Sequence, residues 1–216
     1  MTNELVEKVA NYAQKEYSDI ATGHDWHHIE RVRKNAIFIH SKEGGDRTVI
    51  ELAVILHDIS DYKFNGGNEL LGGDIAFDIV LQQGGSEEIA DKVRTIVNGV
   101  SYKGANVEDK SSSLEAQIVQ DADRLDALGA IGIARTFAYG GHVGNPIYNP
   151  ENTPKLHNSF EEYKNAKSTT INHFYEKLLL LEEKMHTTTA KEVANQRTLF
   201  MKDFLDQFYS EWNCNF

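Results

Sequence analysis

The sequence is poor in the two residues that constrain a chain most strongly, cysteine and proline. Among 216 residues there is one cysteine, Cys214, so no internal disulfide can form. This fits a reducing compartment, and we expect a cytoplasmic protein. The three prolines, Pro146, Pro150 and Pro154, fall in one stretch, which indicates a loop there and leaves the rest of the chain free to be helical.

Long hydrophobic runs and an excess of positive charge are also missing. No apolar stretch approaches the roughly 20 residues that cross a bilayer, and the N-terminus has no apolar signal region. The formal net charge is −11, which argues against binding to a nucleic-acid duplex or to an anionic membrane. An acidic chain that binds phosphate groups therefore needs a local cation, either a metal ion or a small cluster of arginine and lysine.

The alternation typical of half-buried strands is absent, and apolar residues recur instead at helical spacing. The length suits one domain, so we expect a single all-α domain over residues 1–216. The pattern predicts helices over about 2–18, 25–44, 46–58, 69–83, 86–97, 113–128 and 129–139. Two long helices, over about 159–185 and 188–212, are expected to form an antiparallel pair joined by a tight turn.

The stretch Glu51–Asp61 joins an apolar helical run directly to His57 and Asp58. Imidazole and carboxylate both bind metals, and burying an ionised carboxylate costs several kcal/mol unless it is paired or coordinated. Adjacent helix residues project about 100° apart, so the two side chains can flank one ion, with Asp61 over the same side. The alternative is a helix C-terminus at which the helix dipole favours the histidine and Asp58 belongs to a turn.

Histidines near the start of the second predicted helix are further candidates. His28 immediately precedes Ile29, at the edge of the apolar stripe, so its ring can point inward. A histidine placed in this way is also common in protein cores that hold no metal. His24 and His27 fit an exposed helix start better, although they leave a second metal possible.

Three carboxylates, Asp121, Asp123 and Asp126, lie within the largely apolar segment 118–129. Asp121 and Asp123 project about 200° apart on a helix, so a regular turn cannot direct both toward one ion. One interpretation is an exposed acidic face on which Arg124 pairs locally. The scarcity of polar neighbours favours a binding site instead.

Together these segments offer two imidazoles and two carboxylates from three different helices. Such a set suits Mn²⁺, Fe²⁺, Co²⁺, Ni²⁺ or Zn²⁺ with positions open for water, and the lack of usable cysteine argues against a structural zinc site. Candidate contacts to phosphate oxygens, with ordinary surface charge as the alternative, are Arg31, Lys63, Lys103 and Arg124.

The ordered set His28-x-x-Arg31, His57-Asp58-x-x-Asp61 and Asp121-Ala-Asp123-Arg124 resembles the HD-domain metal-dependent phosphohydrolase superfamily. More narrowly, the chain is similar to bacterial stand-alone HD proteins related to nucleotide pyrophosphohydrolases. The resemblance covers most of the chain. It implies a compact multi-helix bundle with a core over about 20–130 and a helical C-terminal extension over about 159–212.

The resemblance also implies the ligands of one divalent ion, with Mn²⁺ favoured and Mg²⁺, Co²⁺, Ni²⁺, Fe²⁺ or Zn²⁺ possible. These ligands are His28, His57, Asp58 and Asp123, with Asp121 as the rival for the last position. Asp61, beside Asp58, would handle the attacking water. A divalent ion lowers the pKa of water from about 15.7 toward ~7 and neutralises phosphate charge.

The expected activity is hydrolysis of a small-molecule nucleotide, namely a nucleoside triphosphate cleaved to the monophosphate and pyrophosphate. One alternative keeps the metal but acts as a 5′-nucleotidase or a phosphodiesterase. The other is a helical module that binds a nucleotide without turnover. The carboxylate of Asp61 argues against the last, because a pure binder does not need to handle water. The sequence does not define the oligomeric state.

Overall fold

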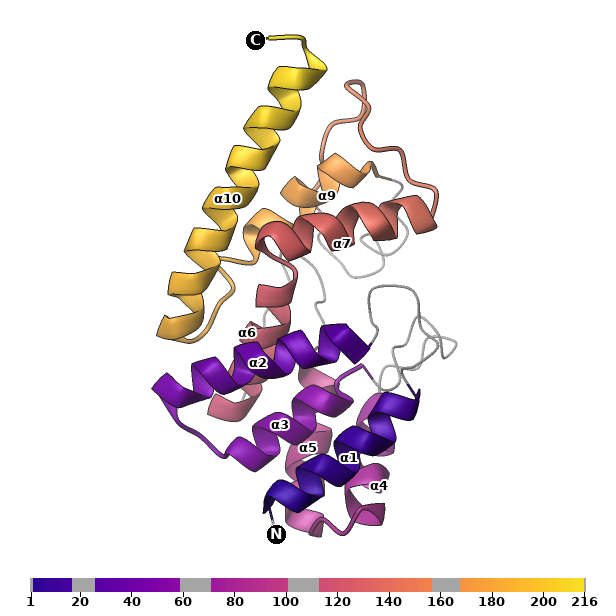
Figure 1. The fold of residues 1–216 in the computed structure, drawn as a ribbon, viewed down its shortest axis with the longest axis vertical. Helices are drawn as coiled ribbons and strands as arrows, with labels where there is room; N and C mark the ends of the chain where they lie inside the picture. Colours follow the sequence, from indigo (N-terminus) through magenta and orange to yellow (C-terminus); the bar gives the residue numbers. More distant parts are fainter. Residues whose placement is uncertain (1, 17–25, 59–70, 101–112, 157–167, 216) are drawn as a thin grey trace. The chain divides into compact units, whose positions relative to one another are not determined.

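The computed structural model describes residues 2–16, 26–58, 71–100, 113–156 and 168–215. Every regular element in these ranges is helical, and they contain no strand, so the all-α prediction is confirmed (Figure 1). Within the described part, no helix combines the length and the apolar character needed to cross a membrane. The chain divides into two compact units, 1–102 with 109–123 and 103–108 with 124–216, and each is described separately.

The first unit is arranged around one buried helix. Its elements are α1 (Thr2–Glu16), α2 (Trp26–Glu43), α3 (Arg47–Leu56), α4 (Leu71–Gln82), α5 (Glu87–Val100) and most of α6 (Leu114–Asp126). Every residue of α3 from Val49 to Leu56 is buried, and α3 contacts α1, α2, α4 and α5. A helix that is apolar on all sides belongs in a core, as the run before His57 predicts. The C-terminal end of α3 is consequently held from several directions.

The start of α3 is defined by side-chain capping. The carboxylate of Asp46 accepts hydrogen bonds from the backbone N–H groups of Thr48 (2.9 Å) and Val49 (3.3 Å). Gly45 has φ +94°, a conformation that glycine adopts easily and that turns the chain into this cap. The backbone N–H of Asp46 also donates to the side chain of Glu115 on α6 (2.9 Å). The cap thus fixes where α3 begins and ties it to α6.

Glu51 is the exception within the apolar α3, because it is a buried acid. Arg33 of α2 donates to one of its carboxylate oxygens and Arg47 to the other, each at 2.7 Å. A buried carboxylate is tolerated when such charge-assisted hydrogen bonds satisfy it. This acid is therefore accounted for by structure and needs no metal.

The second unit contains α7 (Gly129–His142), α9 (Thr170–Glu176), the short 3₁₀ helix η1 (Leu178–Leu180) and α10 (Thr188–Trp212). Helix α7 contacts both α9 and α10. Between them lie the rings of Phe137, Phe174 and Phe204, whose centroids are 5.8–6.2 Å apart.

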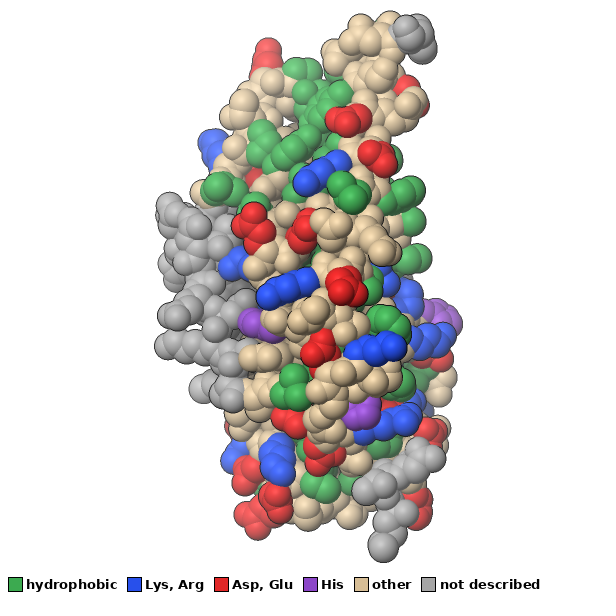
Figure 2. All heavy atoms as spheres, turned by 90° about the vertical axis from the view of Figure 1, so that its left-hand side faces the viewer, with side chains coloured by type: hydrophobic (Ala, Val, Ile, Leu, Met, Phe, Trp, Pro, Cys, Tyr) green, Lys and Arg blue, Asp and Glu red, His purple; other side chains and the backbone are tan. Residues whose placement is uncertain are grey.

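On the face shown in Figure 2, acidic and basic side chains are interspersed and form no broad basic area among the described residues.

The predicted long helix over 159–185 is wrong in the part that the structure describes, because residues 168–185 form α9 and η1 and not one long helix that could pair with α10. The helix there is only α9, because the backbone of Lys177 leaves the helical region at φ −142° and ψ −60°. The N–H groups of Thr170 and Ile171 donate to the carbonyls of Pro146 and Ile147, and the Thr169 hydroxyl caps the helix start. These tertiary hydrogen bonds outweigh the local helix propensity. The other long helix is confirmed as α10.

Replacing the α3 cap should destabilise the first unit measurably. We expect Asp46→Ala to lower the free energy of unfolding by about 1 kcal/mol, because two backbone N–H groups lose their acceptor. Urea titration followed by circular dichroism measures the change. Lys42→Ala, at an exposed position on α2, should stay within about 0.5 kcal/mol of the parent protein. Equal stability of the two variants would contradict this role for the cap.

Candidate metal centre

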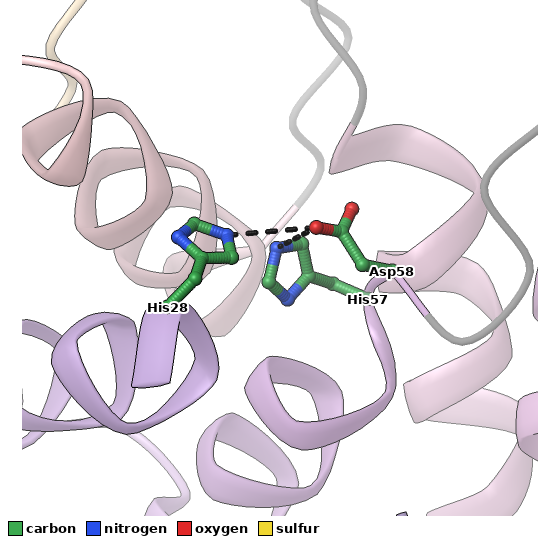
Figure 3. Close-up of side chains that lie close together, drawn as sticks. All are labelled: His28, His57 and Asp58. Atoms are coloured by element: carbon green, nitrogen blue, oxygen red, sulfur yellow. Dashed lines mark ion pairs between the residues drawn. The ribbon is translucent and has the colours of Figure 1, made fainter. Parts of the chain in front are cut away.

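Three helices of the first unit bring two histidines and two aspartates together. His28 lies near the start of α2, His57 and Asp58 directly follow α3, and Asp123 lies near the end of α6. Asp58 Oδ2 is 3.5 Å from His28 Nε2 and 3.4 Å from His57 Nε2. Dashed lines in Figure 3 mark these two pairs. Asp123 Oδ1 is 3.5 Å and 3.7 Å from the same two nitrogens. The structure therefore collects two imidazole nitrogens and two carboxylate oxygens.

Burial differs between the two kinds of side chain. The side chains of His28 and His57 are 0% and 1% exposed, whereas those of Asp58 and Asp123 are 16% and 34% exposed. The imidazoles thus form the buried side of the cluster, and the carboxylates form the side that water or a ligand can reach.

The orientation of the His57 ring is fixed by the turn that contains it. Its Nδ1 lies 2.7 Å from the backbone carbonyl oxygen of Val54, and only a protonated Nδ1 can donate to that oxygen. In the neutral ring the lone pair is then on Nε2, which is buried and makes no hydrogen bond within the described part of the chain. A backbone carbonyl that accepts from the far ring nitrogen and so orients the ring is typical of histidines that bind metals.

The electrostatics of the cluster favour a cation between the carboxylates. Burial lowers the pKa of His57, but the carboxylates of Asp58 and Asp123 outweigh it and raise this pKa to about 10. Burial raises the pKa of Asp123, but its interaction with the nearby His57, together with the charge of His28, holds this pKa well below its usual range. In the absence of metal, a proton on His57 therefore supplies positive charge that a divalent ion can replace.

The spacing of the donor atoms fits a first-row divalent ion. Donors that each lie about 2.1 Å from an ion are separated by roughly 3.0 Å in octahedral and roughly 3.4 Å in tetrahedral arrangements. The four nitrogen–oxygen separations here are 3.4–3.7 Å, only slightly longer. Donor atoms of His28, His57 and Asp58 all lie within 4.8 Å of one another. His28, His57 and Asp58 can thus hold a divalent metal ion, and Asp123 lies close to the two histidine nitrogens.

The structure describes two of the three other candidate acids. Asp121 is completely buried on α6, and it is Asp123 whose carboxylate oxygen lies close to both imidazoles. In the second unit, Asp126 pairs with Arg135 at 2.8 Å. Asp61 lies outside the described residues.

The candidate cations and the remaining histidines are placed as follows. Arg31 is partly buried, one turn after His28 on α2. Arg124 is buried in the second unit, where its Nη1 donates to the carbonyl of Lys184 and lies 3.2 Å from the ring of His186. His27 is exposed beside Glu30. Lys63, Lys103 and His24 lie outside the described residues.

Two groups near the cluster were not identified from the sequence. One is the Val54 carbonyl, since backbone acceptors leave no mark in a residue pattern. The other is Asn35, whose amide donates to the carbonyl of Ala122, the residue before Asp123, at 3.2 Å. The sequence does contain one indication of Asn35: it is a polar residue seven positions after His28, about two helical turns further along the same face of the helix.

Comparison with known proteins agrees with this arrangement. The family model described as HD domain matches residues 25–128, which include all four clustered residues. Bacillus subtilis YpgQ is 35% identical over 202 residues, covering 93% of this chain and 90% of that protein. A crystal structure of YpgQ in complex with ADP matches with TM-score 0.77 and 31% identity, over 98% of this chain and 97% of that chain.

Two further solved structures cover almost the whole chain. A Lactobacillus plantarum protein matches with TM-score 0.86 and 35% identity over 100% of both chains. An HD-superfamily hydrolase from Bacillus thuringiensis matches with TM-score 0.77 and 39% identity over 99% of both. The chain therefore belongs to the HD-domain family and is an HD-superfamily hydrolase.

Proposed function

We propose that this hydrolase is a metal-dependent phosphohydrolase that cleaves a nucleoside triphosphate to the monophosphate and pyrophosphate. The observation that carries the proposal is the set of two imidazole nitrogens and two carboxylate oxygens separated by 3.4–3.7 Å. The crystal structure of the relative YpgQ with ADP supports a nucleotide as the ligand. The acidic composition supports it too, because phosphate binding by such a chain requires a local cation.

His28, His57, Asp58 and Asp123 would hold the ion, with Asp121 as the alternative for the last position. The ion would supply Lewis acidity and positive charge to the phosphate group and to the attacking water. The hydrogen bond from His57 Nδ1 to the Val54 carbonyl leaves the lone pair on Nε2, where it can bind the metal ion. The buried imidazoles restrict the approach of substrate to the side on which the carboxylates are exposed.

Residues around this centre would bind the phosphate groups and handle the water. Arg31 follows His28 by one turn and offers a planar guanidinium that suits bidentate contact with phosphate oxygens. Lys63 and Lys103 would add positive charge. Asp61 would orient the water and accept its proton, with Asp58 beside it. Arg124 is a weaker candidate for a phosphate contact, because its guanidinium already donates to the carbonyl of Lys184.

Removing the His-Asp pair should abolish hydrolysis. We expect His57→Ala with Asp58→Ala to lower kcat/KM for a nucleoside triphosphate by about a thousandfold or more, because a nitrogen and an oxygen donor are lost together. The matched control is His142→Ala with Asp203→Ala, at exposed positions of α7 and α10. Turnover by the metal-loaded proteins is followed by chromatography of the products.

The products separate the proposed reaction from its alternatives. One pyrophosphate per monophosphate is expected. Release of orthophosphate instead would indicate a nucleotidase-type reaction. Thermal stabilisation by the nucleotide with no product would indicate a binding module. Hydrolysis that persists in the double variant would exclude this centre as the active site.

The last ligand can be assigned with two matched variants on α6. We expect Asp123→Asn to weaken Mn²⁺ binding by about a hundredfold, because an anionic donor beside both imidazoles becomes a neutral amide. Asp121→Asn should change the affinity by less than about threefold, although it lowers stability at a fully buried position. Isothermal titration calorimetry with the metal-free proteins measures both. The opposite ranking would assign the position to Asp121.

Metal affinity should rise with pH. The pKa of His57 in the metal-free protein is raised to about 10, so below that value an incoming ion must displace its proton. The affinity for Mn²⁺ should therefore fall about tenfold for each unit of pH lowered between pH 9 and pH 6. Asp123 is ionised throughout this range and contributes no further proton. Calorimetry in buffers of different ionisation enthalpy counts the released protons, and a pH-independent affinity would contradict the competition.

A further inference from the structure

The side chain of Asn35 links the helices that carry the first and the last of the proposed metal ligands. Asn35 lies on α2, about two turns after His28, so both side chains project from nearly the same face. Its Nδ2 donates to the backbone carbonyl of Ala122 on α6, with a separation of 3.2 Å. Ala122 is completely buried and directly precedes Asp123. One hydrogen bond thus joins the backbone beside Asp123 to the helix that carries His28.

The chemistry of the two groups determines the direction of this hydrogen bond. A backbone carbonyl can only accept, so the amide nitrogen of Asn35, not its oxygen, must face Ala122. A carbonyl oxygen has two lone pairs, so it can accept from Asn35 as well as from the N–H four residues later in a regular helix. The Asn35 contact is therefore compatible with an intact α6.

This contact is directional, unlike the apolar contacts of the side chains that α2 buries after His28. The side chains that α2 buries after His28 are all apolar, namely Ile29, Val32, Ala36 and Ile39. Apolar contacts stabilise without direction and tolerate small shifts of one helix along another. The separation of 3.5 Å between His28 Nε2 and Asp123 Oδ1 depends on how α2 and α6 are placed along their axes. A hydrogen bond with defined geometry can hold that placement.

We propose that Asn35 is a positioning residue for the metal centre. Its hydrogen bond to Ala122 holds Asp123 at the distance from His28 that allows both to contact one divalent ion. This inference rests on the metal centre assigned above, and it adds a residue that touches neither metal nor substrate. The role resembles that of other residues behind metal ligands, which orient the ligands without binding the ion.

The test uses Co²⁺ as the probe, because its visible absorption reports the number and arrangement of its ligands. Asn35→Leu replaces the amide with an apolar side chain of similar size. We expect the Kd for Co²⁺ to rise about tenfold and the absorption of the bound ion to change in intensity or wavelength. Asn35→Gln keeps an amide donor and should recover part of the loss.

A matched control removes a hydrogen bond of the same kind elsewhere in the first unit. The side chain of Gln120 on α6 donates to the carbonyl of Gly99 on α5 at 2.7 Å, and α5 carries none of the proposed ligands. Gln120→Leu should bind Co²⁺ with the affinity and spectrum of the parent protein. Thermal unfolding of the metal-free proteins shows whether each variant folds. If Asn35→Leu does not fold, Asn35→Ala, which leaves room for water, takes its place.

The outcomes separate the two proposals. If the parent protein binds no Co²⁺, the metal centre itself is overturned. If it binds Co²⁺ and Asn35→Leu matches it in affinity and spectrum, only the positioning role is overturned. Equal weakening by Asn35→Leu and Gln120→Leu would mean general destabilisation and would also overturn it. A loss confined to the Asn35 variants, with partial rescue by glutamine, supports the positioning role.

Discussion

The candidate centre depends on the burial of two imidazoles against two carboxylates. The carboxylates raise the pKa of His57 to about 10, and the imidazoles hold the pKa of Asp123 below its usual range. Two carboxylates sharing this space repel each other unless a cation lies between them. Either a proton or a divalent ion can supply that cation, so the arrangement is suited to a metal.

The rest of the first unit keeps this cluster in place. Helix α3 is buried along almost its whole length, is capped at Asp46 and is tied to α6 through Glu115, so its end presents His57 and Asp58 in a fixed position. The Val54 carbonyl sets the ring of His57. Few of these contacts involve the functional atoms directly. The precision of the site comes mainly from a rigid apolar helix and from hydrogen bonds to backbone groups.

Prediction from the sequence succeeded where local chemistry decides the structure. Helical periodicity gave α1 to α7 and α10 to within a few residues, and the ordered histidines and aspartates gave the family. It failed over 168–185, where hydrogen bonds from Thr170 and Ile171 to the proline-bearing loop define the start of α9 and the backbone of Lys177 ends it. Periodicity within a segment contains no information about partners contributed by a loop more than twenty residues earlier.

The sequence by itself determined the helical class, the acidic character and the residue types of the candidate metal ligands, because these depend on composition and spacing. Only the tertiary structure decided which aspartate approaches the imidazoles, since Asp121 and Asp123 are equivalent in composition and differ only in the direction that α6 gives them. It also showed that Arg124 is engaged with the Lys184 backbone, and that Asn35 reaches α6. Such assignments depend on distances between segments far apart in sequence, and these are fixed only when the helices pack.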